Sequence, residues 1–308
     1  MYFIKARNGR NEWWRYLAGL SMTLLGYMFI GAIPFTIALA IKTEQGVPID
    51  AGAFSETLDP GMLGFDKNTG LVLMLFPSVL AFFILWGVMA WLHGKKTGDI
   101  ASAEGRIRWK RIVTGALLWL VLTGTAEFIF YTLNPDDYTF SFIPEQFFPL
   151  LIIVLLLIPF QAWFEELLFR AYLMQGIGLL FRSRIVALLI TATGFGLMHS
   201  LNPEVKEFGM MSIMPFYIGF GIFAGLLVVM DNGIELALGV HAINNIYGAV
   251  FVTYESSALK THALFSLEKV NPNMLNLVFI ISATIFIIVM ARIYSWGSWK
   301  KLIQKLPA

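Results

Sequence analysis

The chain has 308 residues, of which 57% are hydrophobic and only 14% are charged. A composition this apolar excludes a soluble globular domain and indicates a protein that crosses a membrane several times. The net charge of +2 gives no reason to expect a nucleic acid partner, and the absence of cysteine excludes disulfides, thiolate metal ligands, a cysteine nucleophile and lipid attachment through Cys.

Runs of about 20 apolar residues predict eight transmembrane helices. Their ranges, in chain order, are 17–41, 71–93, 112–133, 147–168, 185–200, 211–230, 234–254 and 274–294. A helical apolar period continues after the fourth span, so we expect this helix to extend to about residue 181. We interpret the first span as a retained helix rather than a signal peptide, because no cleavage site of small residues follows it. The predicted fold is therefore all-α, with one transmembrane domain over 1–308.

Lys and Arg gather in alternate predicted loops. They precede the first span, lie between the second and third and between the fourth and fifth, and follow the eighth. The intervening loops are poor in them, since 134–146 has none and 42–70 has two. The positive-inside rule then places both termini in the cytoplasm. Turn signals in 42–70 predict an external loop, and we expect a multi-pass protein of the plasma membrane.

Three groups of polar residues lie at predicted membrane depth, where ionisable side chains are costly and are functional candidates. They are "EELLFR" at 165–170, "FGLMH" at 195–199 and "HAINN" at 241–245. Glu166 and Arg170 are four residues apart on one helix face and can neutralise each other. Glu165 points about 100° away and lacks that partner.

Residue counts place these groups at similar depth. Glu165 and His199 each lie about 25 Å from the predicted turn at 182–184. On adjacent antiparallel helices the two side chains would be level, within about 5 Å or bridged by one water. His241 and Asn245 share one face of the seventh span and would reach the same buried site.

Other polar residues have structural interpretations. A single His or Asn in a membrane helix more often bonds a neighbouring helix than takes part in catalysis. We expect Glu127 and Glu235 to be interfacial or structural, and His93 and His262 to be solvated. The GxxxG spacing at 221–225 indicates close helix packing. The combination of an unpaired Glu, two His and an Asn at one depth favours a reactive site.

These residue types suit hydrolysis. A buried carboxylate beside a histidine can act as a general base on water. A second His and an amide can stabilise the oxyanion that forms when the water attacks a carbonyl. Neither G-x-S-x-G nor H-E-x-x-H occurs, so the serine hydrolase and zincin motifs are absent.

The three groups resemble, in order, the EExxxR, FxxxH and HxxxN motifs of the CPBP family, the CAAX proteases and bacteriocin-processing enzymes also called the Abi family. The resemblance covers about 150–250 and implies a catalytic core of four helices at 147–254. It implies an intramembrane endopeptidase whose partners are the lipid bilayer and a membrane-bound peptide or protein substrate. That substrate would be lipidated, as in CAAX processing, or a leader or bacteriocin precursor.

The resemblance also implies a role for each motif residue. Glu165 would be the general base and His199 its partner on the water. His241 and Asn245 would form the oxyanion hole. The supporting residues would be Glu166, Arg170 and Phe195.

Two alternatives stay open. The family is often described as metalloproteases, and Glu165, His199 and His241 suit zinc, whereas its eukaryotic and archaeal relatives are usually described as glutamate-dependent. We expect no cofactor, with zinc as the alternative. The chain could also be a non-proteolytic scaffold, immunity protein or transporter on the same fold. An inactive relative should have lost motif residues, and none is lost here.

Overall fold

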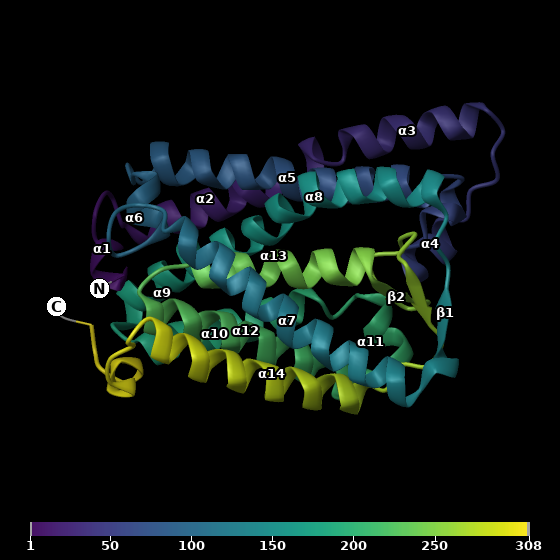
Figure 1. Cartoon of the computed structure of the whole chain (residues 1–308). Helices are drawn as coiled ribbons and strands as arrows, with labels where there is room; N and C mark the ends of the chain where they lie inside the picture. Colours follow the sequence, from purple (N-terminus) through teal and green to yellow (C-terminus); the bar gives the residue numbers. More distant parts are fainter. Residues whose placement is uncertain (1, 307–308) are drawn as a thin grey trace.

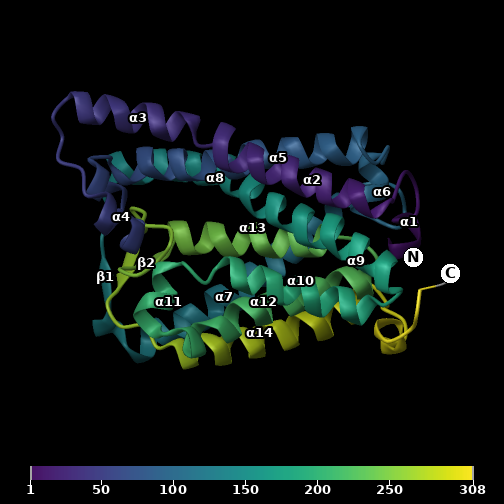
Figure 2. The same ribbon diagram turned by 180° about the vertical axis from the view of Figure 1, so that it is seen from behind.

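The computed structural model describes residues 2–306, which form a bundle of helices with a small sheet at one end (Figure 1). The strands are β1 (Tyr138–Phe140), β2 (Val252–Tyr254) and β3 (Phe265–Leu267). Strand β3 pairs antiparallel with β1 and parallel with β2. Both termini lie at the opposite end of the bundle (Figures 1 and 2). The predicted all-α class is confirmed.

Among residues 2–306, six helical stretches are long and apolar enough to cross a membrane. They are Trp13–Glu44, which joins α2 (Trp13–Leu25) to α3 (Ile33–Glu44), α5 (Lys67–Trp91), α7 (Trp109–Leu133), Pro144–Phe181, α12 (Met210–Asp231) and α14 (Pro272–Ile293). The other two predicted spans are the helices α10 (Arg184–Met198) and α13 (Glu235–Val250), with 15 and 16 residues. The predicted number of eight is not confirmed, because these two are shorter than the roughly 20 residues that a full span needs.

Short helices lie in the connections at the two ends of the bundle. They are α1 (Tyr2–Lys5), α4 (Ala51–Thr57), α6 (Thr97–Ala101) and α11 (Pro203–Phe208). The first and third lie beside the termini, and the other two lie beside the sheet (Figures 1 and 2). The predicted external loop at 42–70 therefore contains helix α4.

Helix α13 runs through the middle of the bundle. It lies between a layer that contains α2, α5 and α8 (Pro144–Glu166) and a layer that contains α10, α12 and α14 (Figures 1 and 2). Its residues from Glu235 to Ala242 are all buried. Large apolar side chains on α3, α7 and α14 are exposed instead, as expected of a surface that contacts lipid. The central helix can therefore carry polar residues without presenting them to the bilayer.

Glycines allow close helix packing. A Cβ on Gly239 of α13 would collide with the backbone carbonyl of Ile112 on α7. A Cβ on Gly221 of α12 would lie 2.8 Å from the carbonyl oxygen of Ala192 on α10. The close packing predicted from the GxxxG spacing at 221–225 is thus confirmed.

The fourth predicted span continues as helix to Phe181, as expected, but it changes its winding. It consists of α8, the π-helical segment η4 (Leu167–Leu173) and α9 (Met174–Phe181). Short π-helical segments inside α-helices are frequent at functional sites, and this one begins directly after Glu166. The turn predicted at 182–184 comes next in the chain. Arg182 ends α9 in a left-handed conformation with a φ of 51°, and the Ser183 hydroxyl caps the start of α10.

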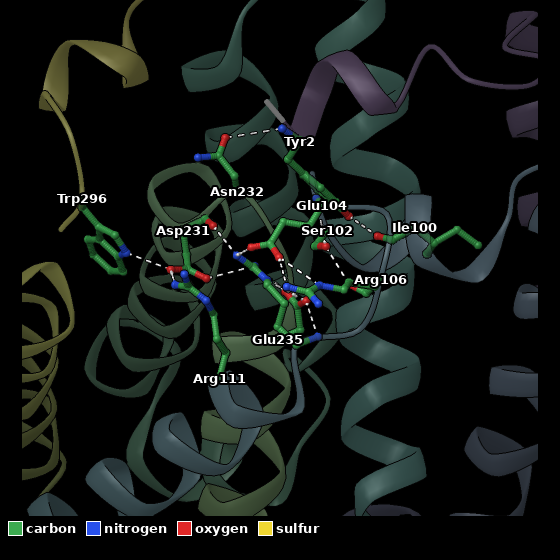
Figure 3. A network of polar contacts seen from close by, with 11 residues as sticks. Tyr2, Ile100, Ser102, Glu104, Arg106, Arg111, Asp231, Asn232, Glu235 and Trp296 are labelled. Carbon is green, nitrogen blue, oxygen red and sulfur yellow. Dashed lines mark hydrogen bonds and ion pairs between the residues drawn. The ribbon is translucent and has the colours of Figure 1, made fainter. Parts of the chain in front are cut away.

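A network of charged side chains joins the elements at the end that holds the termini (Figure 3). Arg108 lies 3.0 Å from Asp231 and 2.6 Å from Glu235, and Arg111 also contacts Asp231. The indole N–H of Trp296 donates to Asp231 at 2.9 Å. The network connects the start of α7, the α12–α13 junction and the segment after α14. Glu235 has a structural role, as predicted.

His93 is buried, so the prediction that it is solvated was wrong. The residue is 1% exposed, and its Nδ1 lies 2.8 Å from the carbonyl oxygen of Arg10. Its Nε2 lies 3.0 Å from the hydroxyl of Tyr172. The segment after α5 turns back towards the bundle instead of extending into solvent. The ring of His93 therefore packs against the ring of Tyr16, with centroids 4.6 Å apart.

Candidate active site

The predicted site residues come from the end of α8, from η4, from the end of α10 and from the middle of α13. They are, in that order, Glu165 and Glu166, then Arg170, then Phe195 and His199, then His241 and Asn245. Side-chain contacts, one of them through Gln161, connect all seven into one cluster.

Glu166 is buried between an arginine and a histidine. Its Oε2 lies 3.2 Å from Nε of Arg170, so the ion pair predicted from the sequence spacing is present. Its Oε1 lies 2.8 Å from Nδ1 of His241. Because a carboxylate only accepts hydrogen bonds, Nδ1 of His241 carries the hydrogen. The Nε2 of His241 then faces the neighbouring carboxylate, Glu165.

The two carboxylate oxygens of Glu165 have different surroundings. Oε1 accepts a hydrogen bond from the side-chain amide of Gln161, one turn earlier in α8. Oε2 is buried without a hydrogen-bond partner in the described part of the chain, and it lies 3.7 Å from Nε2 of His241. This distance is too long for a direct hydrogen bond. At this separation, the oxygen of one water can contact both Oε2 of Glu165 and Nε2 of His241.

The charges in this cluster nearly balance. Glu165 and Glu166 carry two negative charges and Arg170 carries one positive charge. One proton, on His241 or on Glu165, therefore makes the cluster neutral. A buried net charge is costly, so the two carboxylates need the polar neighbours that surround them here. The Glu165 carboxylate and Nε2 of His241 face each other at 3.7 Å, which is too far for them to share a proton directly.

Phe195 lies between the charged cluster and the second histidine. Its ring centre is 4.5 Å from the guanidinium carbon of Arg170 and 5.8 Å from the ring of His241. The ring of His199 lies 4.7 Å away. The attraction between Arg170 and the ring face helps to hold the buried guanidinium. Phe195 thereby supports residues of all three motifs.

His199 lies at the C-terminal end of α10. Its Nδ1 lies 2.8 Å from the carbonyl oxygen of Phe195, so Nδ1 donates and Nε2 of the neutral ring carries the lone pair. The ring stacks on Tyr217 with centroids 4.5 Å apart. The contacts of Phe195 with both histidines agree with a shared site, while the predicted distance between His199 and Glu165 stays a prediction.

A buried carboxylate anchors the segment after His199. Glu204 is 5% exposed, and its Oε1 accepts from the backbone N–H of Ala258 at 2.8 Å and from the hydroxyl of Tyr254 at 3.4 Å. Its Oε2 has no hydrogen-bond partner within residues 2–306. Burial raises the pKa of the Glu204 carboxyl. Glu204 thereby ties the connection between α10 and α12 to the loop after β2.

Glu204→Gln is expected to raise the melting temperature above pH 7. Because the pKa is raised in the folded state, this group favours folding below its unfolded-state pKa of about 4.3. That contribution is lost as the pH rises through the folded-state pKa. Glutamine keeps the accepting Oε1 and removes the ionisation. Thermal unfolding between about pH 4 and 8 should therefore show a flatter profile for the variant, and an unchanged profile would contradict this.

Three residues that occupy no fixed position of the motifs complete the site, namely Gln161, Asn244 and Trp119. The Asn245 amide donates to Oε1 of Gln161 at 3.0 Å and accepts from the amide of Asn244 at 3.2 Å. The indole N–H of Trp119 on α7 donates to Asn244 at 3.1 Å. The i, i+4 spacing of Gln161 and Glu165 could have identified Gln161. No sequence signal connects Trp119 to Asn244, which is 125 residues away.

Zinc is the alternative cofactor predicted for this site. Within residues 2–306, no three His, Cys, Asp or Glu side chains are placed to hold one metal ion. In the alternative zinc set, Nδ1 of His241 is directed at Glu166 and Nδ1 of His199 at a backbone carbonyl. These contacts engage only Nδ1 of each ring and leave Nε2 free, as in histidines that bind a metal, so zinc at Glu165, His199 and His241 stays the alternative prediction.

The family model described as type II CAAX prenyl endopeptidase Rce1-like matches residues 146–247. The resemblance to the CPBP family is confirmed. A protein of Bacillus subtilis (strain 168), described as uncharacterized protein YyaK, is 26% identical over 272 residues, which are 88% of each chain. No solved structure gives a significant match.

The Rce1-like segment contains all three motifs and the helices that carry them. It begins near the start of α8 and ends within α13, close to the core predicted at 147–254. Together with the six apolar helices, the match indicates an integral membrane protein with a segment similar to the CAAX proteases.

Proposed function

We propose that this chain is an intramembrane endopeptidase that hydrolyses a peptide bond in a lipidated or otherwise membrane-bound protein, in the plasma membrane. The observation that carries the proposal is the state of Glu165. One of its oxygens is held by Gln161, and the other is buried, unpaired and 3.7 Å from Nε2 of His241. A carboxylate held in this way is suited to remove a proton from water.

Water attack would begin the reaction. Nε2 of His199 accepts a hydrogen bond from the water and orients it, since Nδ1 is committed to Phe195. Glu165 takes the proton of the water as its oxygen bonds to the carbonyl carbon of the substrate. The proton on Glu165 then passes to the leaving amine, and the peptide separates into an acid and an amine.

Two donors would stabilise the oxyanion that forms in this attack. With a proton on its Nε2, His241 can donate to the oxyanion. The side-chain amide of Asn245 has two N–H groups, and only one of them is bonded to Gln161. The other N–H completes the oxyanion hole.

A cavity of about 530 Å³ adjoins the site between α7, α13 and α14. Its wall is mostly apolar and includes Trp119, Tyr247, Gly248 and Phe279. Asn244, which donates to Asn245, also lines it. Apolar cavities of this size with a few polar groups are typical of binding sites for small apolar groups. We propose that this cavity accepts the apolar part of the substrate.

Gly248→Phe is expected to weaken substrate binding without disturbing the fold. A Cβ at this position meets nothing within 4 Å, so the larger side chain can enter the cavity without displacing a helix. The KM for an apolar substrate should rise roughly 10-fold or more, with little change in melting temperature. Michaelis–Menten kinetics of the purified protein with an internally quenched farnesylated peptide would measure this.

Gly124→Phe on α7 is the matched control. Gly124 also has nothing within 4 Å of an added Cβ and lies outside the cavity wall. Its variant should keep the original KM. Equal KM values for the two variants would show that the cavity does not bind the substrate.

The proposed function is tested by comparing cells that make the intact protein with cells that make Glu165→Ala. We expect shortened forms of one or more membrane-associated proteins only where Glu165 is present. The farnesylated peptide and its free-thiol form then show whether the lipid is required. Identical membrane proteomes and peptide pools in the two cell lines would contradict the proposal.

A further inference from the structure

Five side chains form a chain of hydrogen bonds that ends at Glu165. The indole N–H of Trp119 donates to Oδ1 of Asn244 at 3.1 Å, and Nδ2 of Asn244 donates to Asn245 at 3.2 Å. Nδ2 of Asn245 donates to Oε1 of Gln161 at 3.0 Å. Nε2 of Gln161 donates to Oε1 of Glu165. The chain connects α7, α13 and α8, and it passes through the candidate oxyanion donor on its way to the candidate base.

The two ends of this chain fix the direction of every bond in it. An indole N–H can only donate, and a carboxylate can only accept. Each amide between them accepts with its oxygen and donates with its nitrogen. If the oxygen and nitrogen of one amide exchanged places, two donors or two acceptors would face each other. These buried groups would then lose their hydrogen-bond partners. The bonds therefore run one way, from Trp119 to Glu165.

We propose that this chain of hydrogen bonds makes Gln161 a positioning residue both for the base and for the oxyanion hole. The inference rests on the proposed function. Gln161 holds Oε1 of Glu165, so that Oε2 is the oxygen presented to the water. Its carbonyl oxygen holds one N–H of Asn245, so that the second N–H is presented to the oxyanion. Trp119 and Asn244 act through Asn245 as the start of the same chain.

Packing holds the start of the chain in place. Trp119 is 2% exposed, and its ring lies 5.2 Å from Phe223 and 6.1 Å from Phe279. The direction of its N–H is therefore set by the surrounding rings. In a site of low dielectric constant, each bond in such a chain polarises the next. Removal of the Trp119 N–H should therefore weaken the hydrogen bonds of Gln161, although Trp119 and Gln161 share no direct bond.

The test measures kcat and KM of Gln161→Met, Trp119→Phe and the double variant with the internally quenched farnesylated peptide. Methionine fills the space of Gln161 without its amide, and phenylalanine keeps an aromatic ring without the N–H. Gln161→Met should lower kcat roughly 10- to 100-fold at unchanged KM, the effect of a lost hydrogen bond to a charged group. Trp119→Phe should lower kcat about 5-fold. Because both changes break one chain, the double variant should match Gln161→Met alone.

Two further variants separate positioning from packing. Trp163 is a half-buried tryptophan of α8 whose buried indole N–H has no hydrogen-bond partner within residues 2–306, so Trp163→Phe should keep the original kcat. Gln161→Glu keeps the size and the acceptor for Asn245 but turns a carboxylate towards Glu165. It should lower kcat at least as much as Gln161→Met, because it places a second carboxylate against Oε1 of Glu165.

An unchanged kcat in Gln161→Met, or a double variant whose loss equals the product of the single losses, overturns the inference. If Glu165→Gln is inactive in the same assay, the proposed function stands in either case. If Gln161→Met does not fold, the kcat of Trp119→Phe is compared with that of Trp163→Phe instead. Equal kcat values for these two variants overturn the inference. An active Glu165→Gln variant instead contradicts the proposed function, and the inference falls with it.

Discussion

Replacement of Glu165 with glutamine is expected to abolish peptide cleavage while the protein keeps its fold. Glutamine has the same size and can still accept the hydrogen bond from Gln161, but it cannot take a proton from water. The rate should fall by roughly 10³-fold or more, as expected when a general base is lost. Initial rates with the internally quenched farnesylated peptide measure the effect, and the melting temperature shows whether the fold is intact.

Glu145→Gln is the control for this prediction. Glu145 is an exposed carboxylate in the first turn of the same helix, α8, so its replacement should leave the rate unchanged. Cleavage by Glu165→Gln at the rate of the intact protein would remove Glu165 from the reaction. The base would then have to be another group of the cluster.

Replacement of Glu166 with glutamine is expected to destabilise the protein. Glu166 is fully buried and is the only carboxylate that lies within 4.0 Å of the Arg170 guanidinium in the described chain. Without it, Arg170 keeps the ring of Phe195 and a carbonyl contact with Gly221 at 3.4 Å. A buried charge that loses its partner costs about 3–5 kcal/mol. Thermal or denaturant unfolding in lipid or detergent should show a lower midpoint.

The combination of Glu166→Gln with Arg170→Met tests the cause. This double variant removes both charges, so it should be more stable than Glu166→Gln alone. A double variant whose destabilisation is the sum of the two single effects would show that the ion pair is not the reason. Activity is a separate measurement here, because Glu166 also holds Nδ1 of His241.

Apolar periodicity predicted the helices well, because a bilayer demands long apolar segments. Each of the eight predicted spans is helical over most of its length, although the seventh, 234–254, ends in strand β2, and the extension of the fourth span to Phe181 is confirmed. Their lengths could not be predicted as well. Helix α13 is shielded from lipid by its neighbours, so its burial does not depend on its being long or uniformly apolar. Burial of His93 arises from a turn of the chain after α5 that no periodic pattern encodes.

The candidate site was predictable where its contacts follow helical spacing. The Glu166–Arg170 pair is separated by four residues, and the structure contains it. The contact of Glu166 with His241 was not predicted, because it depends on how α13 is rotated against α8. The role of Trp119 depends in addition on the crossing of α7 over α13. Such rotations are set by packing, for example at Gly239, and local sequence does not determine them.

The π-helical segment η4 holds one more residue in a turn than an α-helix does, directly after the paired carboxylates. Because the wide turn takes up this residue, α8 and α9 keep nearly the rotational phase of one continuous helix. Deletion of one residue within η4 should therefore restore regular winding with the glycines of α9 still against the rings they face, Gly176 against Tyr16 and Gly178 against Phe3. A deletion in regular helix has no wide turn to compensate for it and rotates the residues that follow by about 100°. One-residue deletions should therefore be better tolerated within η4 than elsewhere in this long helix.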